Sequence, residues 1–315
     1  MIYTLTLNPA IDWELQIDHF EINGVSRAKQ SQSDCGGKGF NVSRMLRNLK
    51  TDSVAMGFVG GMNGQRLESG LRELEVATDF TWIQGETRTN VSIVAVDNAE
   101  HIKVNEPGPT VTAIEVEELF RQVEGALAPG DWWVMGGSLP VGVDTGIYAQ
   151  LIERIQQAGA HAILDSSGDA LLQGCKARPT LVKPNLEEAL QLIGMADGGV
   201  DTMRASAGKV LEMGPENLVV SLGEEGAMLV TRQGMEMIHT PDIIERNHIG
   251  AGDSLVAGMV WQLSQGASYA DAIRYGVACG AATASKSGTE LGSYEDVASL
   301  VKQCHEQDGQ GAVVV

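Results

Sequence analysis

The segment Asn247-His248-Ile249-Gly250-Ala251-Gly252-Asp253-Ser254 is a turn of small residues that opens a helix. Gly250, Ala251 and Gly252 carry no bulky side chain, so backbone N–H groups are accessible at the positive end of that helix, where phosphate binds. Asp253 repels a phosphate, and its position makes sense if it accepts a proton from an attacking hydroxyl. The segment therefore predicts phosphoryl transfer to an alcohol. The helix itself is indicated by apolar residues at helical spacing, namely Leu255, Val256, Met259, Val260 and Leu263.

Strand-like and helix-like patterns alternate along the rest of the chain. The first strand is expected at 2–7, and several later strands are continuous apolar runs such as Leu218-Val219-Val220, which is typical of strands buried on both faces. This alternation predicts an α/β fold with a doubly wound, mostly parallel sheet and helices on both faces. Further strands are expected at 53–58, 132–136, 162–165, 180–183, 217–221 and 226–231, and helices near 40–49, 64–74, 112–127, 145–158, 186–194 and 202–213.

Two stretches, 13–33 and 87–104, break the alternation with short β-type segments. No shift in composition or Pro/Ser-rich linker divides the chain, so we expect a single domain over 1–315 with these stretches inserted as a small β-sheet lid. A sheet this small has little core of its own. We therefore expect a homodimer in which the lid of a second subunit covers its apolar face; the alternative is a monomer whose lid folds onto its own domain. The apolar face is expected to hold Trp13, Leu15, Ile17, Phe20 and Ile22 against Val91, Ile93 and Val94.

Composition limits the classes of partner. The chain has 315 residues and is 43% hydrophobic, which is enough for a large core without disulfides. Its formal net charge of −19 makes nucleic acid and anionic membranes poor partners. We expect a cytoplasmic protein, because the sequence starts with no secretion-type leader and contains no apolar run of membrane-spanning length. The cysteines are spaced as reduced thiols rather than as a metal site, at positions 35, 175, 279 and 304.

A second glycine cluster, Gly36-Gly37-Lys38-Gly39, precedes another expected helix. It is not a P-loop, because the GxxxxGK[ST] spacing is absent, and no GxGxxG follows a strand, which argues against a nicotinamide dehydrogenase. One interpretation is a tight turn. The other is a close approach of the backbone to a polar ligand, with Lys38 and Asn41 as hydrogen-bond donors.

Polar residues follow several expected strands, and the carboxyl ends of parallel strands form the ligand crevice. Asp12 follows the first strand and is interpreted either as a turn residue or as an acceptor for sugar hydroxyls. Asn185 and Glu188 have the spacing of a capping box, or they order Mg²⁺ through water with Lys183 near phosphate. The segment 221–226 is either a plain hairpin turn or a surface for a nucleotide.

Together these motifs resemble the ribokinase-like carbohydrate kinases, also called the PfkB family. The resemblance extends from Thr6 to Thr289 and implies the ribokinase-like fold. Within the family the chain is most similar to bacterial 1-phosphofructokinases, with tagatose-6-phosphate kinases and minor 6-phosphofructokinases next. The motifs occur in the family order as Gly36-Gly37-Lys38-Gly39 with Asn41, Gly136-Gly137-Ser138-Leu139-Pro140, Asp165-Ser166-Ser167-Gly168, Lys183-Pro184-Asn185 and Gly250-Ala251-Gly252-Asp253.

The resemblance implies roles for the matching residues. Asp253 is the implied general base, and the amides of Gly250, Ala251 and Gly252 form the implied anion hole. The implied sugar ligands are Asp12, Gly37 and Asn41. Groups implied for the substrate phosphate or neighbouring hydroxyls are Lys38, Arg88, Ser138 and Lys103, with Arg27 reaching from a partner's lid. Residues implied for ATP and Mg²⁺ are Lys183, Asn185, Glu188, Ser221, Gly223 and Gly226.

The leading expectation is that ATP phosphorylates fructose 1-phosphate to fructose 1,6-bisphosphate. The alternatives are a tagatose-6-phosphate kinase or a 6-phosphofructokinase. A hypothesis of another class is a non-catalytic regulator that binds a phosphosugar on the same fold.

Overall fold

The structure is a computed structural model that describes residues 1–21, 23–97 and 100–311. Its main sheet has nine strands, which are β1 (Ile2–Thr6), β4 (Val54–Val59), β5 (Ala77–Trp82), β8 (Trp132–Gly136), β9 (His161–Asp165), β10 (Leu181–Val182), β11 (Leu218–Ser221), β12 (Ala227–Thr231) and β13 (Gly234–Ile238). Their order is β13-β12-β11-β10-β9-β8-β1-β4-β5. The pairs β11–β12 and β12–β13 are antiparallel and the other pairs of this sheet are parallel, so the prediction of a mostly parallel sheet is confirmed. Within the described residues, no helix is long and apolar enough to cross a membrane.

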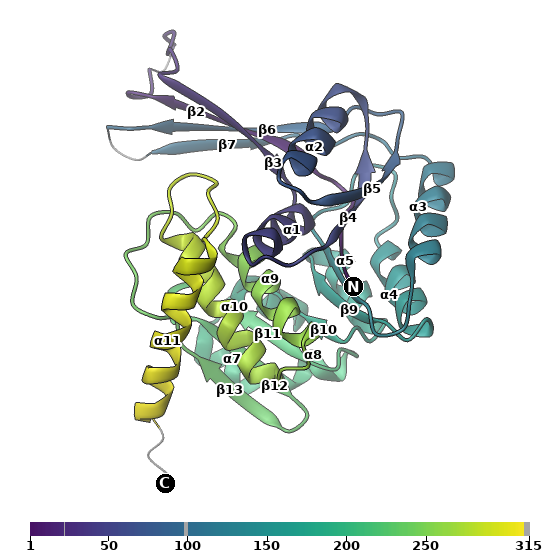
Figure 1. Ribbon diagram of the computed structural model, residues 1–315, viewed down its shortest axis with the longest axis vertical. Coiled ribbons are helices and arrows are strands. Elements are labelled where there is room, and N and C mark those ends of the chain that lie inside the picture. The colour runs from purple at the N-terminus through teal and green to yellow at the C-terminus, as the bar shows by residue number, and fades with distance from the viewer. Residues whose placement is uncertain (22, 98–99, 312–315) are drawn as a thin grey trace.

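Helices cover both faces of the main sheet (Figure 1). On one face lie α1 (Lys38–Asn48), α2 (Gly61–Glu73), α9 (Ala251–Ser264), α10 (Tyr269–Ala284) and α11 (Tyr294–Gly311). On the other lie α3 (Ala113–Ala126), α4 (Ile147–Gln157), α5 (Gly168–Lys176), α6 (Leu186–Leu192), α7 (Val200–Ser206) and α8 (Gly208–Glu212). Strand β8 is buried along its whole length because its alternate side chains enter both layers: Trp133 and Met135 pack with α4, and Trp132 and Val134 with α1 and α9.

The strand order places a topological switch beside β1. From β1 the main sheet is extended on one side by β4 and β5, and the chain then crosses to β8 on the other side. Both neighbours of β1 pair with it in parallel, so three carboxyl ends meet at this point. In open α/β sheets the ligand crevice forms at such a switch.

One predicted element differs in detail from the structure, and another departs from the parallel order of the main sheet. The strand expected at 226–231 is β12, and it runs antiparallel to β11, as a hairpin turn at 221–226 requires, because only the short turn η1 (Gly223–Glu225) connects them. A parallel pair needs a crossover of a dozen or more residues. The helix expected at 202–213 is divided into α7 and α8, and Gly208, a poor helix former, is the first residue of the second piece.

The lid is a separate sheet made of β2 (Ala10–Ile17), β3 (Gln30–Gly36), β6 (Arg88–Ala95) and β7 (His101–Asn105). Its order is β3-β2-β6-β7, and its long strands project from the main body beyond α1 and α2 (Figure 1). The prediction of a small second sheet from 13–33 and 87–104 is confirmed. It starts earlier than expected, at Ala10, and only residues 7–9 separate β2 from β1.

The register of the lid separates an apolar face from a polar one. Trp13 pairs with Val91, and Leu15 pairs with Ile93. Side chains at alternate positions share a face, so these four lie together, and the pairing of β6 with β7 extends their face. It gains Ile102 and Val104, which are 50% and 58% exposed.

Two members of the predicted apolar face were wrong. Val94 pairs with Gln16 and therefore lies on the polar face, together with Asp12 and Lys103. Phe20 follows the end of β2 and belongs to neither face, and Ile22 lies outside the described residues.

Candidate active site

The N-terminus of α9 provides backbone donors for an anion. Gly250 precedes the helix with φ of 78°, a left-handed conformation that glycine adopts without strain. The first turn of a helix leaves N–H groups without intrahelical acceptors. Helix α9 begins at Ala251, whose amide donates to the carbonyl of His248 at 3.2 Å, and the amides of Gly252 and Asp253 follow in its first turn. A Cβ atom on Gly252 would lie 3.8 Å from Lys183 Nζ, so an ammonium group adjoins these amides. The structure thus brings the predicted anion hole and Lys183 together.

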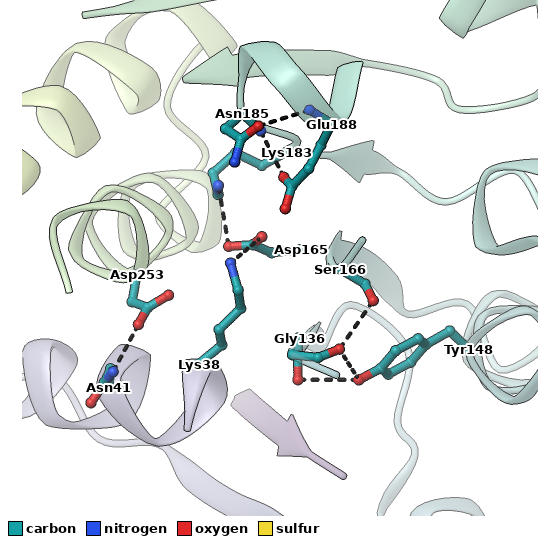
Figure 2. A network of polar contacts seen from close by, with 11 residues as sticks. Lys38, Asn41, Gly136, Tyr148, Asp165, Ser166, Lys183, Asn185, Glu188 and Asp253 are labelled. Atoms are coloured by element: carbon teal, nitrogen blue, oxygen red, sulfur yellow. Dashed lines mark hydrogen bonds and ion pairs between the residues drawn. The ribbon is translucent and has the colours of Figure 1, made fainter. Parts of the chain in front are cut away.

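Asp253 is almost completely buried in this first turn. Its side chain is 8% exposed, and its Oδ2 accepts a hydrogen bond of 2.8 Å from Asn41 Nδ2 on α1 (Figure 2). Burial raises the pKa of Asp253, and the bond from Asn41 and the charge of Lys38 offset this only in part. A carboxylate whose pKa is raised toward neutrality is better suited to accept a proton than an ordinary aspartate.

A second carboxylate, Asp165, lies beneath the site at the end of β9. Figure 2 shows Lys38 and Lys183 converging on it from α1 and from the end of β10. Lys38 Nζ donates to Oδ1 at 2.8 Å, and Lys183 Nζ lies 3.2 Å from Oδ2. Burial raises the pKa of Asp165, but the two ammonium groups outweigh it and hold this pKa below its ordinary value. Asp165 therefore fixes both lysines while remaining ionised.

The sequence did not predict a role for Asp165, although it lies in the family motif Asp165-Ser166-Ser167-Gly168. The sequence did contain a signal for Asp165: it is an acidic residue at the end of an apolar strand, and the ends of parallel strands form the ligand edge of the sheet. Its two partners are distant in sequence, with Lys38 127 residues before it, so local patterns gave no indication of the pairing.

The glycine cluster before α1 permits close packing of the chain on itself. Gly37 is the N-cap of α1 with φ of 136°, and a Cβ atom there would lie 2.7 Å from Thr6 Cγ2. A Cβ atom on Gly36 would lie 2.2 Å from Asp12 Oδ2. The tight turn is therefore present, and the close approach that the glycines allow is to β1 and the lid. The role of Gly37 toward a sugar stays a prediction.

The polar face of the lid carries two residues with predicted substrate roles, Asp12 on β2 for sugar hydroxyls and Lys103 on β7 for the phosphate or neighbouring hydroxyls. Asp12 Oδ1 accepts a hydrogen bond of 2.8 Å from Asn90, which the sequence did not single out as a site residue. Lys103 lies on the same face and pairs with Ser92 in the neighbouring strand. Asp12, Asn90 and Lys103 are thus placed on one surface of the lid.

Arg88 joins the base of the lid to the main domain. Its Nη2 and Nε donate to the carbonyl of Asn8 at 2.9 and 3.2 Å, and its Nη1 donates to the carbonyl of Glu106 at 2.7 Å. Burial lowers its pKa. A guanidinium has five N–H donors, so two remain for the phosphate contact that the sequence predicts.

The glycine turn at Gly136 and Gly137, after β8, is held by hydrogen bonds from Tyr148 on α4 and from Ser166. Tyr148 Oη lies 3.1 Å from the carbonyls of Gly136 and Gly137, and Ser166 Oγ donates to Gly137 at 3.0 Å (Figure 2). The next residue, Ser138, accepts a hydrogen bond of 3.3 Å from Asn8 Nδ2 at the end of β1. Ser138 is exposed at the switch point, where the sequence placed it near substrate.

Arg27 lies apart from the other predicted residues. It is exposed in the connection between β2 and β3, beyond the point where the Lys29 amide bonds to the carbonyl of Gln16. Gln16 is four residues along β2 from Asp12, or about 13 Å at strand spacing. The structure of one chain therefore does not bring Arg27 to its own site.

Asn185 and Glu188 form the capping box of α6. Asn185 Oδ1 accepts from the Glu188 amide at 2.8 Å, and Glu188 Oε2 accepts from the Asn185 amide at 2.9 Å. The structural interpretation of this pair is thus confirmed, and its metal role stays a prediction. Among the residues that the structure describes, no three or more His, Cys, Asp or Glu side chains are grouped so as to hold a metal ion.

The segment 221–226 lies beside this capping box. The Ser221 amide bonds to the carbonyl of Pro184 at 3.0 Å, which places Ser221 next to Asn185. Gly223 and Gly226 have φ of 61° and 99°, and they enclose the short turn that joins β11 to β12. The predicted hairpin is therefore present, and the residues predicted for a nucleotide lie along one stretch of the ligand edge.

Comparison with known proteins decides the family. Residues 5–296 match the pfkB family carbohydrate kinases. The chain belongs to the pfkB family. It is therefore a phosphotransferase that acts on a sugar hydroxyl, and the resemblance noted in the sequence is confirmed.

Relatives in this family cover nearly the whole chain. A 1-phosphofructokinase of Bacillus subtilis (strain 168) is 36% identical over 303 residues, which are 96% of this chain and 98% of that protein. A tagatose-6-phosphate kinase of Staphylococcus epidermidis is 35% identical over 262 residues, 82% of this chain and 84% of that one. Phosphofructokinase-2 of Escherichia coli, solved with potassium, superimposes with a TM-score of 0.92 at 31% identity and covers 96% of this chain and 99% of its own.

Proposed function

We propose that this pfkB-family kinase transfers the γ-phosphoryl group of ATP to the C6 hydroxyl of fructose 1-phosphate, giving fructose 1,6-bisphosphate and ADP. The observation that carries the proposal is the buried Asp253 in the first turn of α9, within the electrostatic reach of the two lysines bound to Asp165. The similarity to a 1-phosphofructokinase over 96% of the chain supports this choice of substrate.

In the proposed reaction, Asp253 accepts the proton of the attacking hydroxyl. Its raised pKa makes it a stronger base than an ordinary aspartate, and the bond from Asn41 holds the carboxylate in one orientation. The amides of the 250–252 turn and the ammonium of Lys183 stabilise the charge of the transferring phosphoryl group. The sugar lies under the polar face of the lid, where Asp12 and Lys103 face it.

Asn185 and Glu188 suit a magnesium ion that is bound mainly through water. The capping box uses the single side-chain oxygen of Asn185 and Oε2 of Glu188, and Glu188 Oε1 is not part of it. Magnesium keeps several waters and takes one or two carboxylates together with substrate phosphates. When bound, the ion neutralises negative charge on the phosphate oxygens. Ser221, Gly223 and Gly226 are proposed to support the nucleotide beside it.

The base is tested with Asp253→Asn. We expect kcat to fall by about 10³-fold or more, because the proton acceptor is lost and the hydroxyl is misplaced, while the sugar phosphate still binds in calorimetry. Asp201→Asn, at an exposed position on α7, is the matched control and should leave kcat unchanged. A variant that keeps a tenth of wild-type kcat contradicts the role of Asp253.

The substrate is tested by a coupled assay across fructose 1-phosphate, fructose 6-phosphate and tagatose 6-phosphate. We expect the highest kcat/KM on fructose 1-phosphate. Tagatose 6-phosphate is the second candidate, because a kinase named for it is 35% identical to this chain. A higher kcat/KM on either of the other two sugars would refute fructose 1-phosphate as the preferred substrate. The role of Asp253 as the base would still be tested separately by Asp253→Asn.

We further propose a homodimer through the lids. The distal apolar face, with Ile102 and Val104 half-exposed, supports this proposal, because a second copy of the same face would bury both. The same arrangement brings Arg27 toward the neighbouring site. Light scattering should report a dimer for wild type and a monomer for Ile102→Asp. Ile114→Asp, a matched change at an exposed position on α3, should remain dimeric. A fully active wild-type monomer would refute the dimer.

A further inference from the structure

Arg44 reaches the candidate active site through Asn41. It is on α1, one turn after Asn41, and its Nη1 donates to Asn41 Oδ1 at 3.2 Å. Asn41 Nδ2 in turn donates to Asp253 Oδ2 at 2.8 Å. A carboxamide has its acceptor and its donors at opposite ends. Because Arg44 occupies the acceptor, the NH₂ group of Asn41 is directed at Asp253.

The other contacts of Arg44 reach the lid and a distant loop. Its Nη2 lies 3.8 Å from Oδ1 of Asp34 on lid strand β3, and its Nη1 lies 3.4 Å from the carbonyl of Cys35. Nη2 also reaches the carbonyl of Thr289 at 3.5 Å, in the connection between α10 and α11. The hydroxyl of Thr289 donates to Asp34. One guanidinium therefore joins α1, the lid and the 285–293 connection.

The ion pair between Arg44 and Asp34 is sheltered from solvent, unlike the ion pairs on the surface of this chain. The side chains of Arg44 and Asp34 are 14% and 22% exposed. The next arginine on the same helix, Arg47, pairs with Asp52 and Glu75 at 85% and 71% exposure. Exposed pairs contribute little to stability or geometry, whereas a sheltered guanidinium with four partners holds them in a fixed arrangement.

We propose that Arg44 is a positioning residue that orients Asn41 toward Asp253 and links this orientation to lid strand β3. Without Arg44 the carboxamide of Asn41 is free to rotate, and the carboxylate loses its fixed donor. The proposal rests on the assignment of Asp253 as the base. It predicts that Arg44 acts on kcat through Asn41, although it does not touch the reacting atoms.

A double-mutant cycle tests this coupling. Arg44→Met should lower kcat at saturating substrates by about tenfold or more, the size expected for a hydrogen bond to a charged group. In an Asn41→Ala background the same change should lower kcat by less than about twofold, because the residue through which it acts is absent. Arg47→Met is the matched control on the same helix and should leave kcat unchanged. Equal losses from Arg44→Met in both backgrounds overturn the proposal.

A pH profile separates positioning from a general structural defect. The bond from Asn41 lowers the pKa of Asp253, while Lys38 and Lys183 also lower it and Asp165 raises it. Of these interactions, Arg44→Met is expected to weaken the bond from Asn41. Loss of that bond raises the pKa of Asp253, so the acidic limb of the pH profile of kcat should move to higher pH. An unchanged limb, together with a loss confined to KM, would assign Arg44 to lid closure alone and overturn the proposal.

Two further variants keep the result decisive. If Arg44→Met unfolds at assay temperature, Arg44→Lys replaces it in the cycle, because a single ammonium cannot serve Asn41 and Asp34 together. Asp253→Asn is measured in parallel. If Asp253→Asn retains high kcat, the proposed base fails. If it is inactive while Arg44 and Asn41 act additively, only the role of Arg44 fails.

Discussion

Replacing Asp165 by asparagine tests the charges beneath the site. Asp165 is 2% exposed, and its two oxygens lie 2.8 Å from Lys38 Nζ and 3.2 Å from Lys183 Nζ. An asparagine accepts from one lysine only and turns its NH₂ group toward the other. Both ammonium groups lose their counter-charge, and the loss matters most at Lys183, whose side chain is 3% exposed against 38% for Lys38. Breaking a buried pair costs about 3–5 kcal/mol, and we expect the free energy of unfolding to fall by that amount.

Denaturant unfolding of the ligand-free protein measures this change directly, and Tm provides a second measure. For a chain of 315 residues the entropy of unfolding is about 0.7 kcal/mol/K, so the expected fall in Tm is about 4–7 °C. Asp201→Asn breaks an exposed pair with Arg204 and should cost less than about 1 kcal/mol.

The pH dependence of the Asp165→Asn effect has a definite sign. Burial raises the pKa of Asp165, but Lys183 and Lys38 hold it below its ordinary value. Its stabilisation is therefore complete above the unfolded value of about 3.9 and is lost as pH falls through the folded pKa. The difference between wild type and variant should shrink in acid. A variant as stable as wild type, or a difference that widens as pH falls, would refute the reasoning.

Three other side chains give separate expectations. Asp253→Asn should raise Tm at pH 8 in calorimetry, because burial raises the pKa of Asp253 and its ionised form is unfavourable; the gain should vanish as pH falls below the ordinary aspartate value. Arg88→Ala should raise KM for the sugar phosphate by about tenfold or more and leave KM for ATP unchanged; a rise confined to ATP would place Arg88 with the nucleotide. Burial raises the pKa of Cys35 to about 11 from 9.0, so iodoacetamide at pH 7.5 should label it about 100-fold more slowly than an ordinary thiol, and rapid labelling in peptide mass spectra would contradict this.

The sheet and most of its covering helices were predictable because their patterns are local. Strands such as β8 are uninterrupted apolar runs, and α3 and α4 have one apolar face. Helix α10 was not predicted, because small apolar residues surround it and hide the helical period. Their small size is needed for packing: a Cβ atom on Gly276 would lie 2.5 Å from the carbonyl of Leu255 on α9.

Other missed elements have weak local signals of a different kind. Strand β5 mixes exposed and buried positions, and β13 is an exposed edge strand. Helix α5 begins at Gly168 and contains Gly174, which reduces helix propensity. Helix α11 is not evident from the sequence, because polar residues outnumber apolar ones along it and its last turn contains two glycines.

A candidate residue could be singled out from the sequence where its place in its own segment suggests a role. Asp253 follows a glycine turn, and Asn185 and Glu188 have capping-box spacing, so a few neighbouring letters indicate each. The roles of Asp165 and Arg44 depend instead on partners that only the fold brings near, such as Thr289, 245 residues after Arg44. No local pattern encodes such a pairing.

The balance of charge at the site has a consequence for how ligands arrive. Lys38 and Lys183 are matched by Asp165 and Asp253, so these four groups carry no net charge when all are ionised. The chain as a whole carries −19. An approaching phosphate ester therefore meets a repulsive field over long distances and becomes attracted only within the crevice, at the range of individual amides and ammonium groups. At an ionic strength of 0.1 M, dissolved salt screens this repulsion at distances beyond about 10 Å. Diffusional encounter with anionic ligands should therefore become faster as ionic strength rises, the reverse of the behaviour of enzymes that steer such ligands with a basic surface.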